Sequence, residues 1–278
     1  MAAYEGLGIF ELTGRVAVVT GAGANGGLGH AIAAGLARHG ADVLAGDIDE
    51  PGAKQTAEEV RALGRRSLPI RCDVSQPAEV ASLFAALDRA FGRLDILVNV
   101  PYAGCRVRPE DLSLDDWHRV LEVNLTGYFL CAQEAGRRMI RQGTGGSIIN
   151  ISSIAGCLAL GRGNFVYSIS KGGINQMTRE LAVEWAQHGI RVNAIVPCQM
   201  RTPALRKWLG DTMPADNPLI SRLLAGIPMN RLGEPEDVVG PAVFLASDAS
   251  AFVTGVLLPV DGGNLALNAG GSHTWPSE

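Results

Sequence analysis

Tyr167 and Lys171 are the residues whose types and spacing point most directly to chemistry. Because they stand four positions apart, they would lie on one face of a helix, about one turn from each other. A phenol has a reference pKa of about 10, and a nearby ammonium favours the phenolate and lowers that pKa. Ser153, just after an expected strand, adds a hydroxyl that can hydrogen-bond a substrate oxygen. Together the three side chains could move a proton on and off an alcohol.

A run of glycines between residues 21 and 29 follows an apolar strand expected over 15–20 and precedes a small-residue helix over 31–38. This order of strand, glycine loop and helix places backbone N–H groups and a helix N-terminus against a pyrophosphate. A glycine-rich turn without a ligand is the alternative, and the next strand decides between them.

That next strand, over 42–47, ends in Asp47, 18 residues after Gly29. In dinucleotide-binding folds a carboxylate at this place binds the adenosine ribose hydroxyls. It also repels a 2′-phosphate, so the sequence favours NAD over NADP. The alternative role for this acid is a helix cap, but Asp49, followed by Pro51, suits a helix start better.

Strands and helices continue to alternate along the chain, which predicts an α/β fold: one Rossmann-type, doubly wound parallel sheet of about seven strands, with helices on both faces. No boundary divides the chain, so residues 1–278 are expected to form a single domain. The expected strands cover 15–20, 42–47, 68–72, 94–98, 147–151, 190–196 and 256–259. The expected helices cover 31–38, 51–63, 75–91, 113–141, a stretch containing Tyr167 that ends at His188, and 235–246.

Composition excludes several classes of function. The net charge of −4 offers no basic field for nucleic acid or an anionic membrane. Apolar runs are shorter than the roughly 18 residues of a membrane span, and the N-terminus lacks the pattern of a signal peptide. The five cysteines are scattered without a Cys-x-x-Cys pair, which predicts reduced thiols in a cytoplasm and no metal site.

With these features in place, the sequence resembles the short-chain dehydrogenase/reductase family along nearly its whole length. The stretches that carry the resemblance are Thr20-Gly21, Gly27-Leu-Gly29, Cys72-Asp73-Val74, Val123-Asn124, Asn150-Ile-Ser-Ser153, Tyr167-x-x-x-Lys171, Arg191-Val-Asn193, Arg201-Thr-Pro203 and Val260-Asp-Gly-Gly263. The resemblance implies an NAD(H)-dependent oxidoreductase that interconverts a secondary alcohol and a ketone by hydride transfer.

The resemblance also implies a role for each site residue. Tyr167 would be the general base in oxidation and the general acid in reduction, and Lys171 would lower its pKa and bind the nicotinamide ribose. Ser153 would hold the substrate oxygen, and Asn124 would anchor a water that joins Lys171 to a proton relay. The implied cofactor contacts are Gly21, Asn25, Gly27, Leu28, Asp47, Asp73 (adenine), Val74, Asn99 (along the cofactor), Tyr167, Lys171, Pro197 and Thr202 (the nicotinamide amide).

Two loops depart from the family pattern, each by two extra residues: 22–26, and 99–104 after the fourth strand. The first and fourth strands are neighbours at the switch point of this fold, so the two loops should face each other across the cofactor crevice. Tyr102 is expected to project into that shared wall. Neutral variation of surface loops is the alternative.

Substrate choice should depend on the 99–108 loop and on residues 199–230, an irregular segment that forms either an apolar lid or a helix pair packed on the sheet. Arg106, Arg108, Arg162 and Asn164 could meet a carboxylate or polyol at the mouth of the site. We therefore favour a small polar, sugar-derived or hydroxy-acid alcohol. A 3-oxoacyl, steroid or cyclic-ketone reductase stays open, as does a non-catalytic NAD-binding sensor. Relatives are commonly tetramers, so a homo-oligomer is expected, and the tail over 264–278 could reach a neighbouring subunit.

Overall fold

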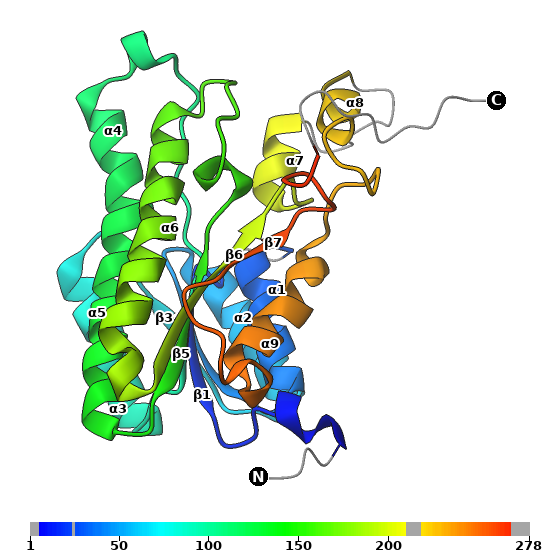
Figure 1. The fold of residues 1–278 in the computed structure, drawn as a ribbon. Helices are drawn as coiled ribbons and strands as arrows, with labels where there is room; N and C mark the ends of the chain where they lie inside the picture. The colour runs from blue at the N-terminus through cyan, green and yellow to red at the C-terminus, as the bar shows by residue number, and fades with distance from the viewer. Residues whose placement is uncertain (1–5, 24–25, 210–217, 268–278) are drawn as a thin grey trace.

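A seven-stranded parallel sheet forms the centre of the protein (Figure 1). The structure is a computed structural model, and it describes residues 6–23, 26–209 and 218–267. Its strands are Val16–Thr20 (β1), Asp42–Asp47 (β2), Ser67–Arg71 (β3), Ile96–Asn99 (β4), Gly146–Ile151 (β5), Ile190–Pro197 (β6) and Leu257–Val260 (β7).

The strand order is β3-β2-β1-β4-β5-β6-β7, and every neighbouring pair is parallel. The order reverses between β1 and β4, where Thr20 lies opposite Asn99. This reversal is the switch point of a doubly wound sheet, at which such folds bind their ligands. The predicted Rossmann-type α/β fold is confirmed.

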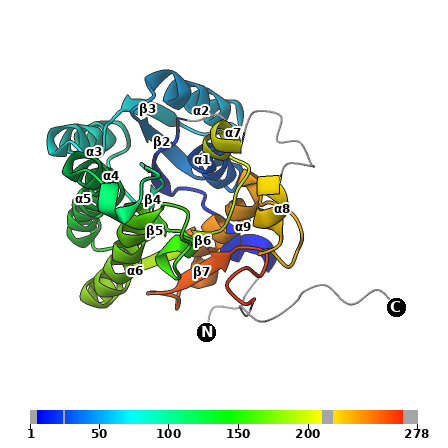
Figure 2. The same cartoon turned by 90° about the horizontal axis from the view of Figure 1, so that it is seen from above.

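Helices cover both faces of the sheet (Figure 2). On one side lie α1, α2 and α9, and on the other lie α3, α4, α5 and α6. Their bounds are Leu28–Arg38 (α1), Glu50–Ala62 (α2), Pro77–Phe91 (α3), Leu114–Leu121 (α4), Gly127–Gln142 (α5), Phe165–Trp185 (α6) and Val239–Ala246 (α9). Two short helices, Pro203–Leu209 (α7) and Pro218–Leu224 (α8), follow β6.

The two faces of the sheet form two apolar cores. Along β1, Val16 and Val18 pack with α3 and α5, whereas Ala17 and Val19 pack with α1 and α9. A strand that is buried on both faces needs apolar residues at consecutive positions, because alternate side chains point to opposite sides. This requirement explains the continuous apolar runs in the sequence.

The long helix expected over 113–141 is present, but it contains an irregularity. Ser113 caps α4 by accepting a hydrogen bond from the backbone N–H of Asp116 at 3.1 Å. Between α4 and α5 the residues Glu122–Thr126 form a π-helical turn. Such turns insert an extra residue into a helix and are frequent at functional sites.

Two local expectations need correction or refinement. The helix expected over 75–91 begins later, at Pro77, because the Ser75 hydroxyl donates to the carboxylate of Asp73 and Gln76 precedes the helix. The segment over 199–230 contains α7 and α8, whose apolar side chains Leu209, Ile220 and Leu223 form a small cluster of their own. Its described part thus contains two helices, and its expected role as an apolar lid stays a prediction.

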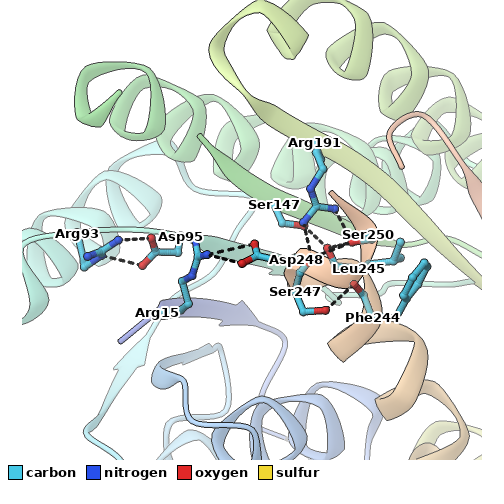
Figure 3. A network of polar contacts seen from close by, with 10 residues as sticks. All are labelled: Arg15, Arg93, Asp95, Ser147, Arg191, Phe244, Leu245, Ser247, Asp248 and Ser250. Atoms are coloured by element: carbon cyan, nitrogen blue, oxygen red, sulfur yellow. Dashed lines mark hydrogen bonds and ion pairs between the residues drawn. The ribbon is translucent and has the colours of Figure 1, made fainter. Parts of the chain in front are cut away.

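Polar contacts join the amino ends of the strands (Figure 3). Arg15, just before β1, pairs with Asp248 at 3.2 Å. Arg191, at the start of β6, donates to the hydroxyl of Ser250 at 2.7 Å. These contacts fasten the chain after α9 to the edge of the sheet opposite the switch-point loops, so Arg191 has a structural role.

Candidate active site

A cleft of about 770 Å³ opens at the carboxyl ends of the strands. Its walls are the segments that follow or end β1 to β6, the place where open α/β sheets bind ligands. Most of the residues singled out in the sequence line it: Gly21, Gly27, Leu28, Asp47, Asp73, Val74, Ser153, Tyr167, Lys171, Pro197 and Thr202. Asn25 lies outside the described residues, and Asn99 and Asn124 are not among the lining residues.

Lys171 reaches the cleft from the buried side of α6. Its side chain is only 1% exposed. The ammonium nitrogen donates to the carbonyl oxygen of Ile151 at 2.8 Å and to the hydroxyl of Tyr128 at 3.4 Å. It lies 5.7 Å from the centre of the Tyr167 ring. The predicted helical spacing therefore does bring the two side chains together.

Burial shifts the pKa values of both members of this pair. Burial raises the pKa of Tyr167 to about 12, against an opposing interaction with the Ser153 hydroxyl. Burial lowers the pKa of Lys171 to about 7. Both shifts follow from the cost of placing a charge in a poorly solvated site. The net pKa of Tyr167 is therefore raised, and the expectation that Lys171 favours its phenolate stays a prediction.

Ser153 stands at the end of β5, where a short 3₁₀ turn begins. Its hydroxyl oxygen accepts a hydrogen bond from the backbone N–H of Ala155 at 3.1 Å. The hydroxyl proton can still be donated to a substrate oxygen in the cleft. Ser153 and Tyr167 thus present two hydroxyls to the same part of the cleft.

A contact that the sequence did not reveal fixes Ser153 relative to α6. The hydroxyl of Ser152 donates to the side-chain oxygen of Asn175 at 2.6 Å and to the carbonyl of Lys171 at 3.3 Å. All of these groups are buried. In the sequence, the only indication that Asn175 faces the site is its spacing of one helical turn from Lys171.

Asn124 belongs to the π-helical turn and is fully buried. Its amide exchanges hydrogen bonds with the backbone of Ala103, at 2.7 and 2.9 Å, and donates to Ser170 at 3.0 Å. Its side chain therefore holds the lengthened 99–104 loop against α6. The expected role in a proton relay stays a prediction.

The side chain of Asn99 is buried and makes polar contacts with two neighbouring strands. Its amide accepts a hydrogen bond from the hydroxyl of Thr20 at 3.2 Å and donates to Asn150 at 3.0 Å. Asn150 in turn donates to Thr178 of α6 at 3.0 Å. The four side chains form a buried polar row across β1, β4, β5 and α6. The expected place of Asn99 along the cofactor stays a prediction.

The glycine loop is shaped to approach a ligand closely. Gly21 has φ 74°, and a Cβ there would lie 2.8 Å from the backbone nitrogen of Pro101. A Cβ on Gly29 would lie 2.0 Å from the carbonyl oxygen of Gly21. Gly27 starts α1 without a side-chain cap, so the N–H groups of the first turn stay available to an anion. These features fit a dinucleotide pyrophosphate.

Asp47 ends β2 beside this loop. One carboxylate oxygen accepts from the backbone N–H of Gly23 at 2.7 Å, and the other accepts from the N–H of Asp49 at 2.8 Å. The carboxylate is therefore held at the cleft in a fixed orientation. Asp73, the second acid in the cleft wall, accepts from the backbone and the hydroxyl of Ser75.

Gly21, just before the first lengthened loop, lies against Pro101 of the second, since a Cβ on Gly21 would lie 2.8 Å from the nitrogen of Pro101. That the two loops face each other across the cleft stays a prediction. Tyr102 lines the cleft, and its ring meets that of Tyr167 edge to face, with centroids 6.0 Å apart. Such a contact contributes about 0.5–1.5 kcal/mol beyond area burial. Tyr102 thus forms part of the wall against which Tyr167 is positioned.

Replacing Tyr102 with alanine should lower kcat/KM by about 2- to 10-fold. This range corresponds to the free energy of about 0.5–1.5 kcal/mol that one edge-to-face contact contributes. Tyr102→Phe keeps the ring and should stay near the wild-type value in steady-state assays. Because Tyr102 is 57% exposed, neither change should disturb the fold. Equal rates for the alanine variant and the wild type would mean that the loop only varies at the surface.

Two features are absent from the described residues. No cluster of histidine, cysteine, aspartate or glutamate there could hold a metal ion. No helix in the described ranges is long and apolar enough to cross a membrane.

The chain is similar to characterised oxidoreductases. A family model described as "Enoyl-(Acyl carrier protein) reductase" matches residues 21–264. A 2-dehydro-3-deoxy-D-gluconate 5-dehydrogenase of Escherichia coli is 43% identical over 268 residues, covering 94% of this chain and 99% of the relative. A cis-4-hydroxycyclohexanecarboxylate dehydrogenase of Sinomonas cyclohexanicum is 42% identical, covering 91% and 97%.

Solved structures share the fold. A short-chain type dehydrogenase/reductase from Mycobacterium marinum superposes with a TM-score of 0.86 at 35% identity, covering 93% of this chain and 98% of that one. A gluconate 5-dehydrogenase from Burkholderia cenocepacia, in complex with NADP and tartrate, gives a TM-score of 0.87 at 35% identity, covering 95% and 100%.

Proposed function

The chain belongs to the short-chain dehydrogenase/reductase family, and we propose that it moves a hydride between a secondary alcohol and NAD⁺, with Tyr167 as the acid and base. The observation that carries this proposal is the convergence of Ser153, Tyr167 and Lys171 in one cleft. The glycine loop and Asp47 line the same cleft of about 770 Å³. The cleft therefore offers places for both the dinucleotide and the alcohol.

The reaction type follows from the relatives and from the site together. The named relatives oxidise alcohols, although the matching family model is described as an enoyl reductase. The four-residue spacing of Tyr167 and Lys171 argues against enoyl reduction, for which related enzymes use a longer spacing. The protein is an oxidoreductase, and CH–OH groups are its expected donors.

In the proposed mechanism, the substrate hydroxyl is bound between Ser153 and Tyr167. Tyr167 takes the hydroxyl proton during oxidation and returns it during reduction. A bound nicotinamide would supply the hydride acceptor. Lys171 lies close enough to Tyr167 that a charge on either favours the opposite charge on the other. We therefore propose that Lys171 takes the ammonium form as Tyr167 ionises.

NAD is the proposed cofactor because of Asp47. Its carboxylate lines the cleft at the end of β2 and is oriented by Gly23. A ribose with free hydroxyls can hydrogen-bond this carboxylate, whereas a 2′-phosphate would be repelled by it. The related gluconate 5-dehydrogenase is in complex with NADP, so the preference of this chain for NAD over NADP is tested by the measurement below.

Changing Asp47 to asparagine should raise the ratio of kcat/KM with NADP⁺ to that with NAD⁺ by about tenfold or more, because one like-charge repulsion is removed. Initial rates with each cofactor measure this ratio. Asp73→Asn is the matched control, since it removes the other cleft carboxylate and should affect both cofactors alike. An unchanged ratio in the Asp47 variant would assign cofactor choice to other residues.

A panel of secondary alcohols tests the proposed function. Purified protein is mixed with NAD⁺ or NADP⁺ and with sugar acids, polyols, hydroxyacyl thioesters, cyclic alcohols or steroids, and cofactor reduction is followed. Turnover of polyols or hydroxy acids would support the proposal. Cofactor binding without turnover across the panel would contradict it and favour the sensor function.

Subunit association and compartment are further parts of the proposal. Large apolar side chains are exposed on neighbouring helices, among them Phe129 on α5 and Ile169 and Val183 on α6. They support a homo-oligomer, which sedimentation velocity measures directly. All five cysteines are free thiols, which suits the cytoplasm, and fractionation of cells that express the protein tests this location.

A further inference from the structure

Two arginines line the cleft beside the proposed catalytic residues. Arg106 belongs to the loop after β4, and Arg162 belongs to the loop before α6. Both line the same cleft as Ser153 and Tyr167. They therefore stand where the part of a substrate beyond its reacting carbon would lie.

The two loops that carry these arginines are joined to each other. The backbone N–H of Val107 donates to the carbonyl of Gly163 at 3.3 Å, and Val107 forms an isolated parallel bridge with Asn164. A Cβ on Gly163 would lie 3.2 Å from the nitrogen of Val107, so the two backbones are in close contact. The relative positions of Arg106 and Arg162 are thus fixed by the backbone.

Arg162 adopts an uncommon backbone conformation, with φ 63° between two glycines that also have positive φ. The left-handed region is unfavourable for a residue with a long side chain. Such conformations occur preferentially at ligand sites, where the surrounding structure enforces them. Here the conformation places a guanidinium, which glycine at this position would lack, in the wall of the cleft.

The charge around these arginines is positive. Burial is the main cause that lowers the pKa of Arg106; Tyr102 opposes this shift, and the charge of Arg162 adds to it. The carboxylates among the described lining residues, Asp47 and Asp73, follow β2 and β3. These strands lie on the far side of β1 from β4 and β5. The acids therefore line one end of the cleft and the arginines line the other.

We infer that Arg106 and Arg162 together bind a carboxylate of the substrate, so that the preferred substrates are hydroxy acids and oxo acids. Guanidinium groups match the planar geometry of a carboxylate and can bind it with paired hydrogen bonds. When the two arginines hold the carboxylate of the substrate at the mouth of the cleft, a carbinol carbon elsewhere on the substrate's carbon skeleton can reach Ser153 and Tyr167. This inference rests on the proposed function.

The test compares substrates with and without a carboxylate. One pair is 4-hydroxycyclohexanecarboxylate and its uncharged primary amide, and a second pair is D-gluconate and D-glucitol. The variants are Arg106→Gln and Arg162→Asn, because asparagine tolerates the left-handed backbone. Arg108→Gln is the matched control, since Arg108 is exposed on the same loop but does not line the cleft.

Each cleft variant should lower kcat/KM for the acids by about 10- to 100-fold, the loss of one charge-assisted contact. The neutral partners should change by less than about threefold, and the Arg108 variant should match the wild type for both. Equal losses for acids and neutral partners, or an equal loss in the Arg108 variant, would overturn the inference.

Binding separates this inference from the proposed function. If the wild type oxidises none of the four compounds, the proposed reaction on them fails. Calorimetric titration of 4-hydroxycyclohexanecarboxylate and its amide into the wild type and the arginine variants then decides about the carboxylate site. Tighter binding of the acid that is lost in both cleft variants supports the site, and equal binding of acid and amide refutes it.

Discussion

Tyr167→Phe should lower kcat by about 10²- to 10⁴-fold, which is the usual contribution of a positioned acid or base. The variant lacks the hydroxyl that exchanges a proton with the substrate but keeps the ring that meets Tyr102. Cofactor and substrate binding should change little, because the lost interaction develops mainly in the transition state. Steady-state rates and calorimetric titration of NADH measure the two effects separately.

Tyr102→Phe is the matched control for this experiment. It removes a phenolic hydroxyl from the same cleft and leaves the proposed proton transfer intact. If Tyr167→Phe kept more than about a tenth of the wild-type kcat, another group would have to move the proton, because a positioned acid or base contributes at least about 10²-fold.

Lys171→Met should remove most activity and yet leave the fold at least as stable. Its kcat should fall by about 10²-fold or more, because the proposed proton transfer loses the ammonium that favours the ionised Tyr167. Replacing a buried charged group by an apolar side chain of similar length is often neutral or stabilising. Lys171 is 1% exposed, and its nitrogen donates to the Ile151 carbonyl and the Tyr128 hydroxyl, neither of which carries a negative charge. Activity assays and urea unfolding of the same preparation check both parts.

The stability effect should depend on pH with a definite sign. The pKa of Lys171 is lowered from 10.5 to about 7 in the folded protein. Between these values the unfolded chain binds more protons at this lysine, so its contribution to the free energy of unfolding rises with pH. Lys171→Met should therefore stabilise the protein more near pH 7 than near pH 10.

Urea unfolding of the wild type and the variant at both pH values measures the difference in their free energies of unfolding. The contributions of the other titrating groups are largely the same in the two proteins and cancel in this difference. A stability difference that is the same at both pH values would show that the lysine titrates normally in the folded state. A variant that unfolds at much lower urea concentrations would instead give Lys171 a structural role.

The fold was predictable because its signals are local. The strand expected over 42–47 matches β2 at both ends, since an apolar run, a preceding glycine and a terminal acid all lie within a few residues. The glycine loop and the acid after β2 followed from the same short-range patterns. The π-helical turn at Glu122–Thr126 had no such signal, because one extra residue in a helix leaves the apolar pattern on both sides intact.

The contacts at the site that the sequence did not reveal join distant parts of the chain. Asn99 and Asn150 are 51 positions apart, and only the strand order places them side by side. The pKa of Tyr167 depends on how deeply α6 packs on the sheet, which spacing along the helix does not specify. Family motifs identified which residues matter, whereas the structure determined which contacts each of them makes.

The buried row of Thr20, Asn99, Asn150 and Thr178 has a consequence for folding. Parallel strands of small apolar residues such as β1 and β4 could pair in several alignments, because valine and isoleucine pack similarly at many positions. Shifting one strand by a residue turns its side chains to the opposite face and leaves the amides unpaired, at about 1–3 kcal/mol for each buried group. Misaligned sheets are therefore less stable than the native one, and the buried row favours a single strand alignment.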